Sequence, residues 1–154
     1  MSQTADARET TRSVRVGQAC ACFNIRKTAR LVTQLYDEAL RPTGLRITQF
    51  GLLMATSRLG PVTVTRLAEV MAMDRTTLTR NLRPLEKQEF LRIELGEDRR
   101  ERQVTLTDRG QQALRGAFPL WEKAQAWMAE SFGQARLQRL LGEMSGLRKA
   151  SRKR

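Results

Sequence analysis

The sequence predicts a mainly α-helical fold with one small β-hairpin near its middle. Apolar residues recur every three or four positions over most of the chain, which is the period of a helix packed on one side. Two short runs rich in β-forming residues, "LRIEL" and "QVTLT", flank a single charged turn. With 154 residues, 40% of them hydrophobic, the chain has the size of one domain and can bury a core. The expected order of elements is α-α-α-α-β-β-α-α.

Two helices are expected in the first third of the chain. The first spans Gly17 to Leu40, and the turn residues Pro42 and Gly44 end it. A second, mostly apolar helix follows over about Thr48–Leu59. The apolar face of the first helix consists of Cys22, Ile25, Ala29, Val32, Tyr36 and Ala39.

Capping residues mark the next elements. Thr63 can cap a short helix over about Val64–Ala72, and Asp74 can cap a fourth helix. The two strands are expected near Leu91–Leu95 and Gln103–Leu106.

Two helices complete the chain. Thr107 or Asp108 can cap a long helix that runs to about Ser131. Gly133 marks a break, after which apolar residues at helical spacing predict the last helix.

The middle segment is typical of a helix-turn-helix followed by a wing, because two short helices and a tight turn precede a hairpin. If Leu78, Leu82 and Leu85 of the fourth helix face inward, its opposite face is mostly basic. That face carries Thr76, Arg80, Arg83 and Lys87. In a DNA major groove, Arg can bridge a guanine, Thr can meet a base edge and Lys can neutralise phosphate. The alternative is an ordinary solvated face, and the flanking helix and hairpin favour DNA binding.

The stretch "LAEVMAMDRTTLTRNLRPLEKQEFLRIELGEDRRERQVTLTDRG" resembles the MarR (multiple-antibiotic-resistance repressor) family of bacterial regulators. The wing pattern is the most specific part: Asp98-x-Arg100, then Leu106-Thr107 and Gly110. The resemblance covers about Cys20 to Leu147. It implies a mainly α winged helix-turn-helix over about residues 48–107, flanked by dimerisation helices over about 17–40 and 108–147.

The resemblance also implies which residues meet DNA. In the recognition helix they are Arg75, Thr76, Thr77, Arg80, Arg83 and Lys87. In the wing, Arg100 would enter a minor groove, whose negative potential favours arginine, and Asp98 would hold the wing in shape through an Arg contact. Arg99 and Arg102 would serve phosphates.

Two positions depart from the family pattern. Pro84 lies inside the fourth helix, removes one N–H and crowds the carbonyl of Arg80, which predicts a kink or an early end. Glu89 stands where the family often has Gly, which argues against the usual left-handed helix cap.

A homodimer is expected through the first and last helices. Two-fold symmetry then predicts a near-palindromic double-stranded DNA site with half-sites about one turn apart. The alternative is that the apolar stripe of the last helix covers the protein's own core. The expected interface residues are Ile25, Leu137, Leu140, Leu141, Met144 and Leu147.

The first helix also resembles that of organic-hydroperoxide repressors within the family, which implies Cys22 as a redox sensor and Tyr36 as its hydrogen-bonding partner across the dimer. Arg26 and Ile47 stand where two further tyrosines are expected. The alternative is that Cys20 and Cys22 are small apolar residues near a helix start. Within a regular helix, side chains two apart diverge, which argues against a disulfide between them. A small-molecule effector is the other means of release that the resemblance implies.

Composition excludes several classes of function. The chain has no histidine and two cysteines, so it lacks the usual equipment of an enzyme or a structural zinc site, and no cofactor or metal is expected. The net charge is +12, and residues 136–154 contribute half of it, which favours an anionic partner. No membrane span or export signal is expected, so the cytoplasm, with nucleoid association when bound to DNA, is the predicted location. Residues 1–16 are expected to form a flexible arm and 148–154 a disordered basic tail.

The leading hypothesis is therefore a sequence-specific DNA-binding transcriptional regulator, a repressor released by a ligand or an oxidant. One alternative is a nucleoid-type winged-helix protein that binds nucleic acid without sequence preference. A winged helix used for protein contacts is another, for which the basic stripe gives no reason.

Overall fold

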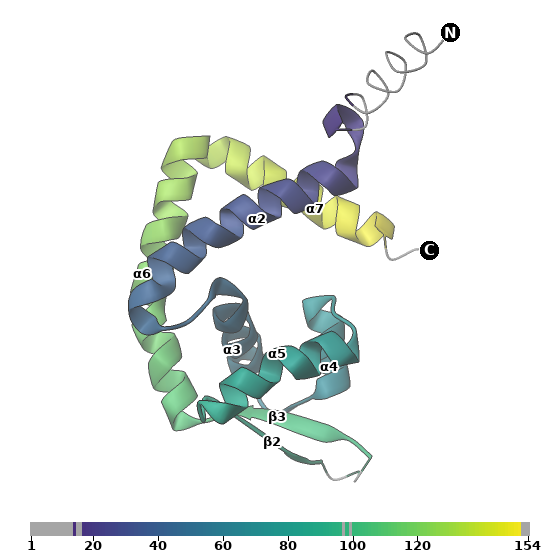
Figure 1. Ribbon diagram of the computed structural model, residues 1–154, viewed down its shortest axis with the longest axis vertical. Helices are drawn as coiled ribbons and strands as arrows, with labels where there is room; N and C mark the ends of the chain where they lie inside the picture. The colour runs from purple at the N-terminus through teal and green to yellow at the C-terminus, as the bar shows by residue number, and fades with distance from the viewer. Residues whose placement is uncertain (1–13, 15–16, 97, 99, 152–154) are drawn as a thin grey trace, which may run out of the picture.

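The computed structural model describes Val14, residues 17–96, Asp98 and residues 100–151. A lower lobe holds three helices and the sheet, and α6 leads from it to an upper part formed with α2 and α7 (Figure 1). The elements, labelled as in Figure 1, are α2 (Ala21–Leu40), the 3-10 turn η1 (Arg41–Thr43), α3 (Ile47–Leu59), β1 (Val62–Thr63), α4 (Val64–Met71), α5 (Arg75–Lys87), β2 (Leu91–Leu95), β3 (Arg102–Leu106), α6 (Asp108–Phe132) and α7 (Gln134–Ser151). The predicted fold class and order of helices are confirmed.

The core lies in the lower lobe. Leu53 of α3, Leu67 of α4 and Leu82 of α5 are fully buried together with Val104 of β3. An aromatic cluster joins this core to α6, because the Phe50 ring meets Phe118 edge-on at 5.4 Å and stacks on Trp121 at 6.1 Å. Burying a leucine contributes about 1.5–3 kcal/mol, so this close-packed core fixes the angle of α5.

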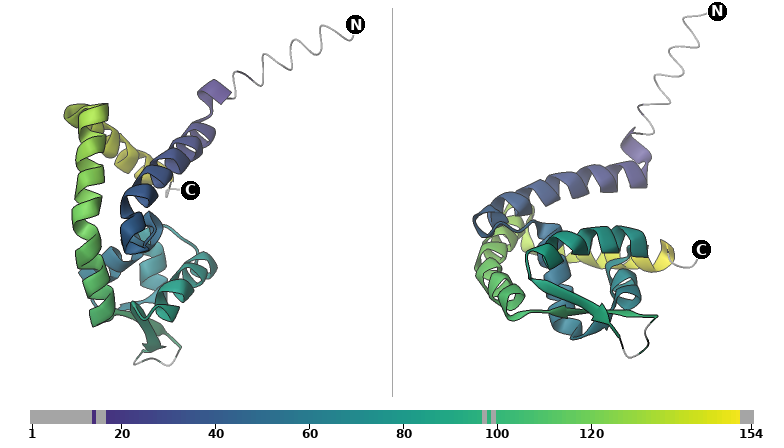
Figure 2. Two further views of the ribbon diagram at one scale, coloured as in Figure 1. Left: turned by 60° about the vertical axis from the view of Figure 1, so that its left-hand side comes forward. Right: turned by 60° about the horizontal axis from the view of Figure 1, so that its bottom comes forward.

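The sheet has three antiparallel strands in the order β1-β3-β2, where the sequence predicts two. The unpredicted strand β1 pairs Val62 with Val104 and Thr63 with Gln103. A strand of two residues shows no alternation, and its pairing depends on contacts far along the chain. The hairpin of β2 and β3 projects beyond the helices of the lobe in both views of Figure 2.

A close approach of two backbones fixes the start of α6. The Thr107 hydroxyl caps the helix by accepting the Gly110 N–H at 3.0 Å. A Cβ at Gly110 would lie 2.0 Å from the carbonyl oxygen of Phe90, so only glycine fits. The end of α5 and the start of α6 are thereby locked together across the base of the wing.

Two predictions at the ends of the chain are wrong. The first helix does not run unbroken from Gly17, because Cys20 is an extended N-cap residue, with ψ 108°, that precedes α2. The basic tail is not disordered from residue 148, because α7 continues to Ser151. The expected arm, Val14 aside, and residues 152–154 lie outside the described residues.

Candidate nucleic-acid interface

The recognition helix α5 begins at a fully formed cap. Asp74 Oδ1 accepts the Thr77 N–H at 2.8 Å and Oδ2 accepts the Thr77 hydroxyl at 2.6 Å. These two hydrogen bonds hold the pKa of the Asp74 carboxyl below its usual range. The prediction of Asp74 as N-cap is confirmed, and the cap fixes the first turn of the helix.

The two faces of α5 separate as predicted. Leu78, Leu82 and Leu85 have no exposed surface. Thr76, Arg80, Arg83 and Lys87 are all exposed on the other side. A shallow hollow on this face is lined by Arg75, Thr76, Thr79, Arg80 and Arg83. The face therefore presents hydrogen-bond donors and positive charge to solvent in one strip.

Two threonines of α5 are engaged locally. The Thr77 hydroxyl is taken up by Asp74, and the Thr79 hydroxyl donates to the Arg75 carbonyl oxygen at 2.7 Å. Thr77 is also half-buried, whereas Thr76 is exposed. Thr77 thus serves the cap in this structure, whereas Thr76 is exposed on the basic face of α5.

The predicted early end of α5 at Pro84 is wrong. The helix continues to Lys87, and Pro84 accepts a backbone hydrogen bond from Gln88 at 3.1 Å. Pro84 removes one backbone N–H, and the buried Leu82 and Leu85 on either side of it keep this part of α5 packed against the core. Arg83 and Lys87 therefore stay on the exposed face of a continuous helix.

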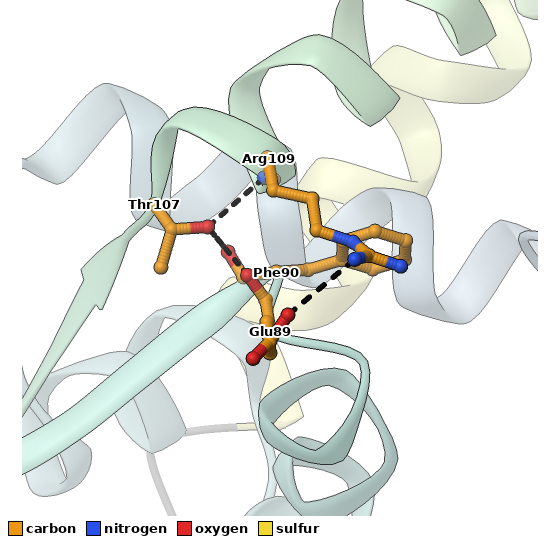
Figure 3. A network of polar contacts seen from close by, with 5 residues as sticks. Glu89, Phe90, Thr107 and Arg109 are labelled. Carbon is orange, nitrogen blue, oxygen red and sulfur yellow. Dashed lines mark hydrogen bonds and ion pairs between the residues drawn. The ribbon is translucent and has the colours of Figure 1, made fainter.

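The left-handed cap after α5 is present despite the glutamate. Glu89 has φ +60°, and the Phe90 N–H returns to the Leu85 carbonyl at 2.9 Å. Figure 3 shows what holds it: the Thr107 hydroxyl donates to the Glu89 carbonyl oxygen at 2.6 Å, and the Arg109 guanidinium meets the Glu89 carboxylate at 3.4 Å. The same guanidinium lies 5.8 Å from the centre of the Phe90 ring. These contacts from the start of α6 offset the backbone strain that glycine would avoid.

The wing tip is shaped by Asp98 through the expected contact with an arginine, and that contact is to the backbone of Arg100. Asp98 Oδ1 accepts the backbone N–H of Arg100 at 2.9 Å, and the Asp98 carbonyl accepts the Glu101 N–H at 2.8 Å. Arg100 and Arg102 are exposed on the wing. Arg99 lies outside the described residues.

The turn between α4 and α5 has two features that the sequence did not reveal. Ala72 adopts the left-handed conformation with φ 51°, which sets the angle between the two helices. The Asn81 side chain of α5 donates to the sulfur of Met73 at 3.7 Å. Neither residue type signals such a role in a sequence, since left-handed turns favour glycine.

Four of the six predicted dimer residues are exposed in the single chain. Leu140, Leu141 and Leu147 are 40%, 52% and 47% exposed, and Ile25 is 38% exposed. Leu137 and Met144 are half-buried, and α7 has no buried residue. The outer part of the α7 stripe, Leu140, Leu141 and Leu147, therefore remains uncovered in the single chain.

The two candidate redox residues are apart. Cys22 is exposed in the first turn of α2, whereas Tyr36 is buried near its end. The Tyr36 hydroxyl donates to Gln125 Oε1 of α6 at 2.6 Å, and burial raises its pKa. Because Cys20 precedes the helix, the argument from helical spacing against a Cys20–Cys22 disulfide does not apply to this structure.

In the part of the chain that the structure describes, no cluster of metal-ligating side chains occurs. Within the same residues, no helix is both long and apolar enough to cross a bilayer.

Comparison with known proteins agrees with this geometry. Residues 43–101 match the model of the MarR family. The crystal structure of a Mycobacterium tuberculosis transcriptional regulator, MosR, in complex with DNA is 39% identical, with a TM-score of 0.76, and the alignment covers 86% of this chain and 98% of that one. E. coli MarR in complex with operator DNA has a TM-score of 0.77 at 18% identity, over 86% of this chain and 96% of that one, which shows a shared fold.

A curated relative is the uncharacterised HTH-type transcriptional regulator YwoH of Bacillus subtilis, 32% identical over 83 residues. That alignment covers 54% of this chain and 61% of the relative, so less than two thirds of its length is matched. Both relatives are named as transcriptional regulators. The chain belongs to the MarR family of transcriptional regulators.

Proposed function

We propose that the protein is a homodimeric, sequence-specific DNA-binding regulator that represses transcription from the bacterial chromosome in the cytoplasm. The observation that carries the proposal is the exposed face of α5. Thr76, Arg80 and Arg83 stand in the open on a helix whose other side is locked into the core. A rigid helix with this face can enter a major groove, where arginine recognises guanine and threonine meets a base edge.

The wing supports the same proposal. Arg100 and Arg102 are exposed on a hairpin that extends past the lobe, at the side of the recognition helix (Figure 2). A hairpin in this position reaches the groove next to the one that α5 occupies. Arg100 would enter the minor groove while Arg102 contacts a phosphate.

The open apolar surfaces of α2 and α7 support a homodimer. Every residue from Ala21 to Arg30 is exposed, and this segment includes Phe23 and Ile25 at 48% and 38%. A helical segment with large apolar residues and no buried side gains little stability on its own, because most helical stability comes from packing. A second copy of the chain would cover these faces, and its two-fold axis would place two α5 helices on a near-palindromic operator.

Release from DNA by a small molecule or an oxidant is the regulatory part of the proposal. Cys22 is the candidate sensor because it is exposed on α2, within the segment proposed to form part of the dimer face. Tyr36 donates a hydrogen bond to Gln125 of its own chain and lies near the opposite end of α2 from Cys22. In this proposal the cysteine that Tyr36 contacts therefore comes from the partner subunit. Titration of operator binding with an organic hydroperoxide should separate wild type from Cys22→Ser, and identical curves would leave a small-molecule effector as the means of release.

The proposal is tested by selecting fragments of the source genome with the purified protein at about 150 mM salt and excess competitor DNA. Recovery of a few palindromic sites is the expected result. Uniform recovery of fragments that disappears as salt rises would instead indicate the nucleoid-type alternative, since non-specific binding is almost wholly electrostatic.

A further inference from the structure

Leu95 is a large apolar residue that stands in the open at the end of β2. Its side chain is 61% exposed. Strand alternation places it on the same face as Leu91, which is buried, and Ile93, which packs against the core. The hairpin extends past the lobe (Figure 2). The face that is buried at Leu91 is open to solvent at Leu95.

The surroundings of Leu95 are charged rather than apolar. The register pairs Leu95 with Arg102, and side chains of paired residues point to the same face of a sheet. Arg100 lies beyond this pair, in the turn that Asp98 holds by accepting its backbone N–H. The other exposed large apolar side chains of the described residues all lie outside the wing. An isolated leucine is a poor site for a protein partner, which would meet a patch of several hundred Å².

We propose that Leu95 packs against the deoxyribose wall of the minor groove beside the operator half-site. The wing then makes an apolar contact in addition to its arginine contacts. This inference rests on the DNA-binding function proposed above. Sugar C–H groups line the groove, and leucine is among the side chains that proteins insert into it. Arg102 opposite Leu95 and Arg100 beyond this pair would hold the hairpin at the groove, whose negative potential attracts arginine.

Salt dependence distinguishes this contact from a charged one. The experiment measures operator affinity against salt concentration for wild type, Leu95→Ser, Leu95→Met and Arg102→Ala. Leu95→Ser should bind about five- to tenfold more weakly at every salt concentration, with an unchanged slope, because apolar area is lost and no charge. Leu95→Met should restore the affinity, whereas Arg102→Ala should make the slope shallower by about one.

Three results would overturn the proposal. Wild-type affinity in Leu95→Ser would show that the side chain does not touch DNA. A lowered midpoint of thermal unfolding would make Leu95 a structural residue. Weaker self-association with intact DNA affinity would show that it meets a protein.

If the proposed function is wrong, the result differs from a failure of the Leu95 proposal, because the wild-type protein would then enrich no operator. In that case the four proteins are compared on the duplex that wild type does bind. The proposal still requires the same loss at an unchanged slope in Leu95→Ser, and absence of any duplex binding overturns it together with the function.

Discussion

Leucines are buried in the lower lobe and exposed on the last helix. Leu78, Leu82 and Leu85 of α5 have no exposed surface, whereas Leu141 of α7 is 52% exposed. The lower lobe forms a hydrophobic core within one chain, and packing against that core fixes the orientation of α5. The helices at the two ends of the chain leave apolar faces open. In our proposal the surface that meets DNA is therefore held by packing within a single chain, while the apolar faces of α2 and α7 need a second copy to cover them.

The largest expected effect is a loss of stability at the start of α6, where the backbone of Gly110 meets that of Phe90. Gly110→Ala should destabilise the fold by about 3 kcal/mol or more, because the new Cβ would meet the Phe90 carbonyl oxygen, which is backbone and cannot move aside. Gly116→Ala in the same helix is the matched control, since nothing lies within 4 Å of its Cβ position. It should stabilise by about 0.5–1 kcal/mol. Chemical denaturation of both variants checks this, and equal stabilities would contradict the close approach.

A substitution on the exposed apolar face of α7 should preserve the fold of the single chain and weaken the proposed dimer. Leu141→Asp is expected to cost less than about 0.5 kcal/mol in the stability of the single chain, since the site is on the surface. It should weaken self-association by about 2 kcal/mol or more if the face is covered by a partner. Sedimentation equilibrium measures this, with Leu141→Met as the conservative control. An unchanged dimer would place the interface elsewhere.

Within the DNA-reading face, two basic residues should behave differently. If Arg80 contacts a base, as proposed, Arg80→Ala should weaken operator binding by about 1–3 kcal/mol and relax the preference at one base pair. Lys87→Ala should lower affinity equally for all sequences, as a phosphate contact would. Binding to a set of single-substitution operators distinguishes the two. Equal loss on every duplex for both variants would remove the base-reading role of Arg80.

The left-handed residue after α5 offers a smaller effect. Glu89→Gly should stabilise the fold by about 1 kcal/mol, because glycine adopts positive φ without the steric cost. Glu89→Gln tests the exposed ion pair to Arg109 and should change stability very little. Thermal unfolding of the three proteins gives the order. A less stable Glu89→Gly would mean that the contacts of the glutamate side chain outweigh the strain.

The smallest effect is a pH dependence at the start of α5. The pKa of Asp74 is lowered in the folded state by its hydrogen bonds from Thr77, so the ionised cap adds stability above the unfolded pKa. That contribution is lost as the pH falls through the lower, folded pKa. The stability advantage of wild type over Asp74→Asn should therefore shrink below about pH 4. A constant difference across this range would show that the charge of the cap does not matter.

Features fixed by neighbouring residues were predictable from the sequence. Thr63, Asp74 and Thr107 each cap a helix as expected, because a cap depends on a side chain and the next turn of backbone. The exposed strip on α5 was predictable for the same reason, since helical spacing alone separates Arg80 from Leu82.

Features fixed by distant contacts were not predictable. Strand β1 exists because β3 offers it hydrogen bonds, and α5 passes Pro84 because buried leucines hold it. Glu89 keeps its left-handed conformation because Thr107, eighteen residues away, binds its carbonyl. In each case tertiary packing overrides a local preference.

Footprinting of the wild-type protein on its best enriched DNA fragment tests the central claim most directly. Two α5 helices related by a two-fold axis should protect two symmetric half-sites with centres about one helical turn apart. Protection of the minor groove should flank each half-site. A single unrepeated footprint, or protection that moves with fragment length and follows no sequence, would contradict a dimer that reads an operator through α5.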